Sequence, residues 1–289
     1  MDRNTRALPI LETILDSYRF VSDHLRLLMH LGRGPAVVAL LLSAMLGLDS
    51  GFQVTPIYAI ANVVAYGWFA FYVFRIVLLG PDKAQTPAPP RRAGEAAAKV
   101  RSPIAGFMGR ALALGAGALG VFFLLTVVIT VPLTLLDHVG TSQPVAMQAP
   151  SYDVIDMLLI SVVMFCLPVG IPLARFSPAL AAAAIDRDTG FGVALRISRG
   201  YGLRLTVIWI LLAGPFFFGY ALLNVALAQV TEMTGGSLTA SFVTLLLITA
   251  IGMTVTALLS FATARGWQVM TVDRNDGDAD VEQGWGTND

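Results

Sequence analysis

Five arginines lie close together between residues 175 and 204 of this chain, and their side chains are suited to binding phosphate. A guanidinium group presents its N–H donors in a planar fork, so it can bind two oxygens of one phosphate or carboxylate. Such a cluster predicts a surface for membrane lipids with anionic headgroups or for an acidic patch of a partner protein. The candidate binding residues are Arg175, Asp186, Arg187, Arg196, Arg199 and Arg204.

Asp186 and Arg187 also allow a second interpretation of this segment. Their charges can pair with Arg175 or Arg199 and thereby fix a turn that holds two short helices against the membrane surface. In that case the charged residues have a structural role. The sequence alone leaves both interpretations open.

Residues that carry enzyme chemistry are sparse in the rest of the chain. His138 stands beside Asp137, and with Asp153 and Asp156 it could bind a metal ion, although a short polar loop produces such a set by chance. The single cysteine, Cys166, excludes an intramolecular disulfide. The chain contains no HExxH, GxSxG or P-loop motif. We therefore predict no catalytic residue, no metal site and no cofactor.

Proline and glycine interrupt two consecutive apolar segments. Proline removes a helical hydrogen bond and kinks the helix, and discontinuous helices line the substrate path of some transporters. The kink positions are Pro168, Pro172, Gly214 and Pro215. They predict either simple shaping of a helix bundle or a path for a small solute. Arg75 stands at the end of one apolar segment, and the middle of each segment lacks acidic and basic residues. This absence argues against a proton-coupled pump, which needs such residues inside the membrane.

The elements that must position these residues are transmembrane helices. Hydrophobic residues make up 56% of the 289 residues and charged residues 13%, which is too apolar for a soluble domain. The net charge of zero gives no reason to expect a nucleic-acid partner. A helix needs roughly 20 apolar residues to cross a bilayer. Runs of that length predict an all-α protein with about six transmembrane helices, at 35–52, 56–79, 109–136, 154–174, 205–230 and 238–264.

The basic residues predict the orientation of these helices. All 19 Lys and Arg residues fall on the side of the predicted membrane that also holds both termini. By the positive-inside rule that side is the cytoplasm. The opposite side carries acidic residues, namely Asp49, Asp137, Asp153 and Glu232.

The N-terminal region has the pattern of an amphipathic helix. Polar residues recur every three or four positions over 10–33, which predicts a helix lying in the cytoplasmic interface and ending at Gly34-Pro35. Charged residues interrupt the first thirty positions, so no signal peptide is expected and the mature protein should begin at Met1. Two ion pairs are expected on the polar face, Asp16 with Arg19 and Asp23 with Arg26.

These patterns divide the chain into five parts. The interfacial helix occupies 1–34 and a first membrane hairpin 35–79. A proline-rich, flexible cytoplasmic linker follows at 80–103. A four-span bundle covers 104–272 and includes the arginine-rich loop 175–204, and a disordered acidic tail covers 273–289.

The arginine-rich segment resembles one found in a group of bacterial membrane proteins common in alphaproteobacteria. These proteins are similar to the YciC-like family and to the membrane domain of glycerophosphodiester phosphodiesterases. This chain departs from their pattern in the alanine run at 181–184 and at Gly202, where an aromatic residue is common. The resemblance covers 174–205 closely and implies a six-span domain of the bacterial inner membrane without known catalysis. The matching residues are Arg175, Ser177, Asp186, Arg187, Ser198, Arg199, Gly200, Arg204 and Leu205.

Two functions are compatible with these observations. The first is a non-enzymatic inner-membrane protein, an interaction or scaffold subunit that binds a partner protein or anionic lipid through the loop 175–204. The alternative is a transporter of a small apolar or amphipathic solute through the kinked fourth and fifth spans.

Overall fold

The computed structural model describes residues 8–48, 55–84, 103–140, 167–185, 190–234 and 238–283. Every regular element within these ranges is an α-helix, which confirms the all-α class for this part of the chain. The helices are α1 (Ile10–Asp23), α2 (Leu25–Leu48), α3 (Thr55–Leu79), α4 (Pro81–Ala84), α5 (Pro103–Gly140), α7 (Leu167–Phe176), α8 (Pro178–Ala184), α9 (Phe191–Ile197), α10 (Gly202–Thr234) and α11 (Leu238–Gln283).

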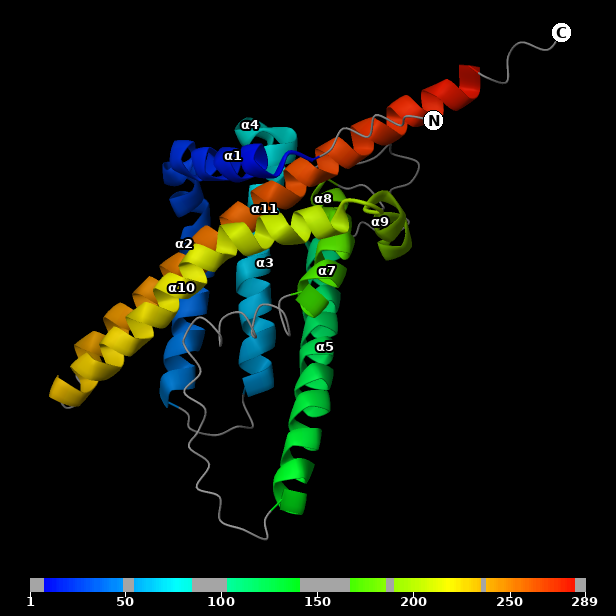
Figure 1. The fold of residues 1–289 in the computed structure, drawn as a ribbon. Helices are drawn as coiled ribbons and strands as arrows, with labels where there is room; N and C mark the ends of the chain where they lie inside the picture. The colour runs from blue at the N-terminus through cyan, green and yellow to red at the C-terminus, as the bar shows by residue number, and fades with distance from the viewer. Residues whose placement is uncertain are drawn as a thin grey trace.

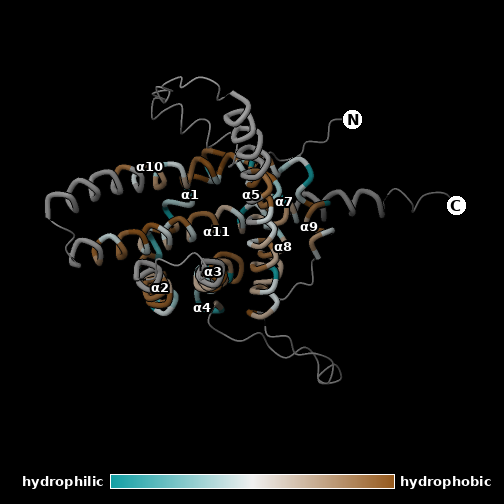
Figure 2. Tube along the Cα trace, turned by 90° about the horizontal axis from the view of Figure 1, so that it is seen from below, coloured by the Kyte–Doolittle hydropathy of each residue, from teal (hydrophilic) through white to brown (hydrophobic). Residues whose placement is uncertain are grey.

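Four of the described helices are long and apolar enough to cross a membrane, which supports a multi-pass membrane protein. Hydrophobic segments run along these helices, as Figure 2 shows from below. Part of the predicted fourth span, 154–166, lies outside the described residues. The apolar windows are Leu25–Leu42 in α2, Ile60–Leu79 in α3, Gly202–Gly219 in α10 and Phe242–Thr271 in α11, with shorter apolar stretches at Ile104–Ala118 and Val169–Ala184.

Helix α3 is the central element of the bundle. It contacts α2, α5, α8 and α11 along its length and α4 at its end. Half of its apolar window (50%) is buried, against 17–33% of the windows in α2, α10 and α11. In Figure 1, α2, α3 and α5 extend in the same direction and the hairpin of α10 and α11 crosses them obliquely. Helix α3 is therefore the most buried of the four, and the other three leave more of their surface for lipid to cover.

The short helices gather at one end of the bundle, which we call the capped end. There α1, α4, α8 and α9 lie around the end of α3 and the beginnings of α2, α5 and α10 (Figure 1). Clusters of buried apolar side chains fill this end, and one of them joins α3, α5, α8 and α11. The tightest packing of the described chain is therefore at the capped end.

The chain bends at His24, and the prediction that it would turn at Gly34-Pro35 is wrong. Helix α1 ends at Asp23, and α2 runs from Leu25 through Pro35 without interruption. A Cβ atom at Gly32 would lie 3.2 Å from the Phe69 ring, so α2 packs closely on α3 just before the proline. This packing keeps the helix continuous although Pro35 has no N–H to donate.

The bend also changes the ion pairs expected on the polar face. Asp16 and Arg19 form the predicted pair, with 3.7 Å between the carboxylate and guanidinium groups. Asp23 and Arg26 form none in the described structure, because the bend at His24 lies between them.

Helical structure extends into two segments that we expected to be unstructured. Pro81–Ala84, at the start of the predicted linker, forms α4. Helix α11 continues beyond residue 273 to Gln283, and its sequence holds no proline that would interrupt the backbone hydrogen bonds. Residues 85–102 and 284–289 lie outside the described ranges.

Helices α3 and α11 meet at Gly252. A Cβ atom at this position would lie 2.6 Å from the Tyr66 Oη and 2.9 Å from its Cζ, so either the Tyr66 ring or the two helices must shift if the residue is larger. We predict that Gly252→Ala lowers the free energy of unfolding in detergent by about 1–3 kcal/mol, even though alanine is the better helix former.

The control for this prediction is Gly219→Ala in α10, an exposed position where the added Cβ meets no side chain within 4 Å. This change should leave stability unaltered or raise it by up to about 1 kcal/mol. Circular dichroism during denaturation in dodecyl maltoside measures both variants. If the Gly252→Ala variant and the control have the same free energy of unfolding, the close contact between Gly252 and Tyr66 does not limit stability.

Candidate functional site

A buried arginine organises the capped end. Arg75 lies in the last turns of α3 and is only 4% exposed. Its guanidinium donates hydrogen bonds to the carbonyl oxygens of Ala84 (3.0 Å), Lys83 (3.3 Å) and Ala184 (3.3 Å). The guanidinium carbon also lies 5.5 Å from the centre of the Phe71 ring, at cation–π distance. One side chain therefore joins α3 to the C-terminal ends of both α4 and α8.

The carbonyl groups that Arg75 binds are the ones that a helix leaves without partners. The last carbonyls of an α-helix have no intrahelical donor and form the negative end of the helix dipole. A buried guanidinium in turn requires acceptors on several sides. The two requirements satisfy each other at this position.

The sequence interpretation missed this role of Arg75. We expected the residue to close the second span at the interface, but its side chain is buried in protein within the apolar window of α3. The sequence already pointed to this residue, because Arg75 is the only Asp, Glu, Lys or Arg in the apolar run 56–79. Such a residue normally finds a partner inside the protein.

A second arginine holds the other part of α8. The Nη1 of Arg110, in α5, donates to the carbonyl oxygen of Ala179 at 3.1 Å. Six of the seven residues of α8 are buried, and all six are alanine or proline. These small side chains allow α8 to lie deep between α3, α5 and α11. Helix α8 is thus a buried helix whose carbonyl groups accept hydrogen bonds from Arg75 of α3 and Arg110 of α5.

The turn between α9 and α10 is fixed to Arg175 at the end of α7. The Ser198 hydroxyl donates to the Arg175 carbonyl oxygen at 2.9 Å. A Cβ atom at Gly202 would lie 2.5 Å from the Arg175 Cγ, so the aromatic residue common in the resembling proteins does not fit here. Gly200 has a φ of 91°, which favours glycine and reverses the chain into α10.

Three candidate arginines project from this turn, and we call them the arginine corner. Arg196 lies in the last turn of α9, Arg199 in the connection and Arg204 in the first turn of α10, and all three are exposed. Within the described ranges their side chains make no ion pair or hydrogen bond. Arg175 differs because its stem is half-buried under the turn. The other two candidate residues, Asp186 and Arg187, lie outside the described residues.

The predicted kink residues lie on separate surfaces. Pro172 of α7 faces a cavity between α7 and α5, whereas Pro215 of α10 is exposed. Gly214 is half-buried beside it, with room for a Cβ atom. Pro168 belongs to α7, but its side chain is outside the described part. Of the described positions, Pro172 therefore lines this cavity and Gly214 and Pro215 do not.

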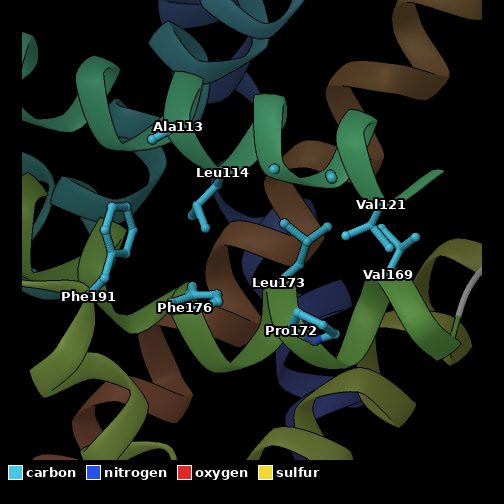
Figure 3. A pocket seen from close by; sticks show the side chains of 10 residues that line it. Ala113, Leu114, Val121, Val169, Pro172, Leu173, Phe176 and Phe191 are labelled. Carbon is cyan, nitrogen blue, oxygen red and sulfur yellow. The ribbon is translucent and has the colours of Figure 1, made fainter. Parts of the chain in front are cut away.

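The cavity beside Pro172 has a volume of about 250 Å³ and an entirely apolar lining. The side chains of α5 and α7 face each other across it, as Figure 3 shows. Phe176 and Phe191 stand at one end, where their rings meet edge to face with centroids 5.6 Å apart. The other wall residues include Leu114, Gly117, Val121, Val169 and Leu173.

The described residues contain no grouping of three or more His, Cys, Asp or Glu side chains that could hold a metal ion. The outer residues considered for this role cannot be placed, since Asp153 and Asp156 lie outside the described ranges and the side chains of Asp137 and His138 are likewise not described. A polar hollow of about 430 Å³ lies between α1, α3 and α11, and its rim includes Asp16, His24, Arg265 and Gln268.

No protein-family model, curated protein or solved structure matches this chain. Its function must therefore be inferred from its own residues. The capped end offers guanidinium donors and an apolar cavity, which suit the binding of anions and of hydrocarbon chains.

The contacts of Arg75 lead to a test of the capped end. Arg75→Met leaves the last carbonyls of α4 and α8 without their donors, so we predict a loss of about 3 kcal/mol in unfolding free energy. Hydrogen–deuterium exchange should rise in α4 and α8 before it rises elsewhere. Arg26→Met, at an exposed position of α2, is the control and should change stability by less than about 0.5 kcal/mol. Unchanged exchange in α4 and α8 would contradict the assigned role.

Proposed function

We propose that this chain is a non-enzymatic protein of the bacterial inner membrane that binds the phosphate groups of anionic lipids through the arginine corner. The observation that carries this proposal is the exposure of Arg196, Arg199 and Arg204 without a described anionic partner. The resemblance of residues 174–205 to YciC-like membrane proteins agrees with a role that needs no catalysis.

The capped end supplies the rigidity that such binding requires. The arginine corner lies on a turn that Ser198 fixes to the end of α7, and α7 continues into the buried α8. Each arginine near an anionic membrane surface contributes about 1 kcal/mol, so three on one turn contribute about 3 kcal/mol. Guanidinium groups held on a fixed turn lose less conformational entropy on binding than groups on a free loop.

The proposal includes six spans with both termini in the cytoplasm. Helices α3 and α7 end, and α5 and α10 begin, at the capped end, and each carries an arginine there: Arg75, Arg175, Arg110 and Arg204. The positive-inside rule then assigns the capped end to the cytoplasm. The arginine corner would meet the inner leaflet, where anionic lipids create a negative surface potential.

We also propose that α1 lies in the cytoplasmic interface. Its face toward the bundle consists of Thr13, Ser17 and Phe20, and both hydroxyls donate to carbonyl oxygens one turn earlier. The neighbouring face exposes Leu11 (71%) and Leu15 (48%). This apolar stripe can enter the headgroup region while the charged third face remains in water.

A solute path is the weaker candidate, because the kink residues of α7 and α10 lie on separate surfaces. A partner protein with an acidic patch offers the arginine corner the same chemistry as lipid phosphate. The retention experiment described below distinguishes the partner from the lipid.

Orientation can be tested by cysteine labelling in intact cells. In a Cys166→Ser background, Gly192→Cys places a thiol at an exposed position of α9, and Ser142→Cys places one in the predicted outer connection. A membrane-impermeant maleimide should label Ser142→Cys in intact cells and Gly192→Cys only after the membrane is opened. Labelling of Gly192→Cys in intact cells would reverse the topology and remove the proposed function.

Lipid retention tests the arginine corner directly. Replacement of Arg196, Arg199 and Arg204 by Gln should lower the amount of co-purifying phosphatidylglycerol and cardiolipin about tenfold or more, because three phosphate-binding charges are lost. Mass spectrometry of the detergent-purified protein measures this amount. The retention of the unmodified protein should also fall with ionic strength.

The matched control replaces Arg19, Arg26 and Arg33 by Gln, which removes the same charge from exposed positions of α1 and α2. This variant should keep most of its anionic lipid, because its three arginines are spread over two helices and do not lie together on one turn. Equal loss in both triple variants would reduce the effect to net charge and contradict a specific site. Loss of a co-purifying protein with lipid unchanged would favour the partner.

A further inference from the structure

The apolar cavity between α5 and α7 has properties that point to a hydrocarbon occupant. Each residue of its wall is Ala, Gly, Val, Leu, Pro or Phe. Water is poorly held in such a space, because a bound water needs two or more polar partners. An apolar cavity of about 150 Å³ can hold a benzene ring. The 250 Å³ available here accommodates a run of several methylene groups.

The shape of the cavity suits a chain that lies along α5. Its wall on this helix extends from Ala113 to Val121, which corresponds to about 12 Å at 1.5 Å per residue. Phe176 and Phe191 close the end nearest α9, and Val121 with Val169 stands at the other end (Figure 3). The cavity thus begins beneath the capped end and follows α5 toward the interior of the bundle.

The aromatic end of the cavity is directly connected to the arginines. Phe176 directly follows Arg175 in α7. Phe191 is the first residue of α9, and Arg196 lies in the last turn of the same helix. We propose that the cavity holds one acyl chain of the phospholipid whose phosphate the arginine corner binds. This inference rests on the proposed function for the headgroup, and the cavity adds a specific place for the chain. The occupant is a bilayer phospholipid with an anionic headgroup.

Gly117 provides a way to close the cavity without disturbing the fold. It lies in the cavity wall, and a Cβ atom built on it meets no atom within 4 Å. A leucine at this position would extend into the space that the chain occupies. Gly120, three residues further along α5, is also exposed and equally free of contacts, but it is not part of the wall. The two glycines form a matched pair.

The experiment uses the full chain in vesicles of phosphatidylethanolamine and phosphatidylglycerol, with a photoactivatable diazirine in the acyl chain of the phosphatidylglycerol. Illumination should crosslink the probe to the α7 segment 169–176 in the unmodified protein. Gly117→Leu should reduce this crosslinking at least about fivefold, because leucine fills the space, and Gly120→Leu should leave it unchanged. Ala113→Leu fills the cavity from its other end and should act like Gly117→Leu. Melting temperatures of all variants confirm that each is folded.

The possible outcomes separate the cavity from the arginine corner. Absence of crosslinking in the unmodified protein, or full crosslinking in Gly117→Leu, would overturn the acyl-chain site while the triple arginine variant still loses its anionic lipid. Crosslinking that survives in the triple arginine variant and disappears in Gly117→Leu would overturn the assignment of chain and phosphate to one molecule. Loss of crosslinking in both variants, with Gly120→Leu unaffected, is the result that we expect.

Discussion

The hydrogen bonds from one buried guanidinium to the free ends of two short helices determine the architecture of the capped end. Helices α4 and α8 are far below the length at which an isolated helix is stable in water. They persist because Arg75 donates hydrogen bonds to their terminal carbonyl oxygens and because apolar neighbours cover α8. The turn that presents the arginine corner follows α8 in the chain and packs on α7, so its position depends on this arrangement.

The arginines of this chain fall into two groups that differ in their partners. Arg75 and Arg110 bind backbone carbonyls inside the protein, and their charge serves the packing of helices. Arg196, Arg199 and Arg204 face outward and have no described partner. The positive-inside rule counts both groups alike, because each keeps its helix end on one side of the membrane. Only the surroundings of each side chain separate an arginine that holds the fold from one that is available to a ligand.

Hydropathy predicted the helical class and the windows in α3, α10 and α11, because long apolar runs identify membrane helices without knowledge of their neighbours. The first span was predicted at 35–52, whereas the apolar window of α2 runs from Leu25 to Leu42. Packing between helices was not predictable in the same way. The continuity of α2 through Pro35 depends on how Gly32 fits against Phe69, and the role of Arg75 depends on where α4 and α8 end.

The candidate site likewise has one part that the sequence predicted and one part that it did not. Arg196, Arg199 and Arg204 could be selected from the sequence because charged residues that flank apolar runs are visible in it. The cavity could not be foreseen, since its two walls come from α5 and α7 and its end from α9. Gly117 is a small residue of the kind that usually permits close helix contact, yet here it borders open space.

The length of α11 has a mechanical consequence. Its apolar window, Phe242–Thr271, has 30 residues and measures about 45 Å, which exceeds the hydrocarbon thickness of about 30 Å. Helices that exceed the bilayer respond to its thickness by inclining. Because α11 also contacts α1, α3 and α8, any change in its inclination displaces the surroundings of Arg75. A change in bilayer thickness that tilts α11 would therefore also move the capped end.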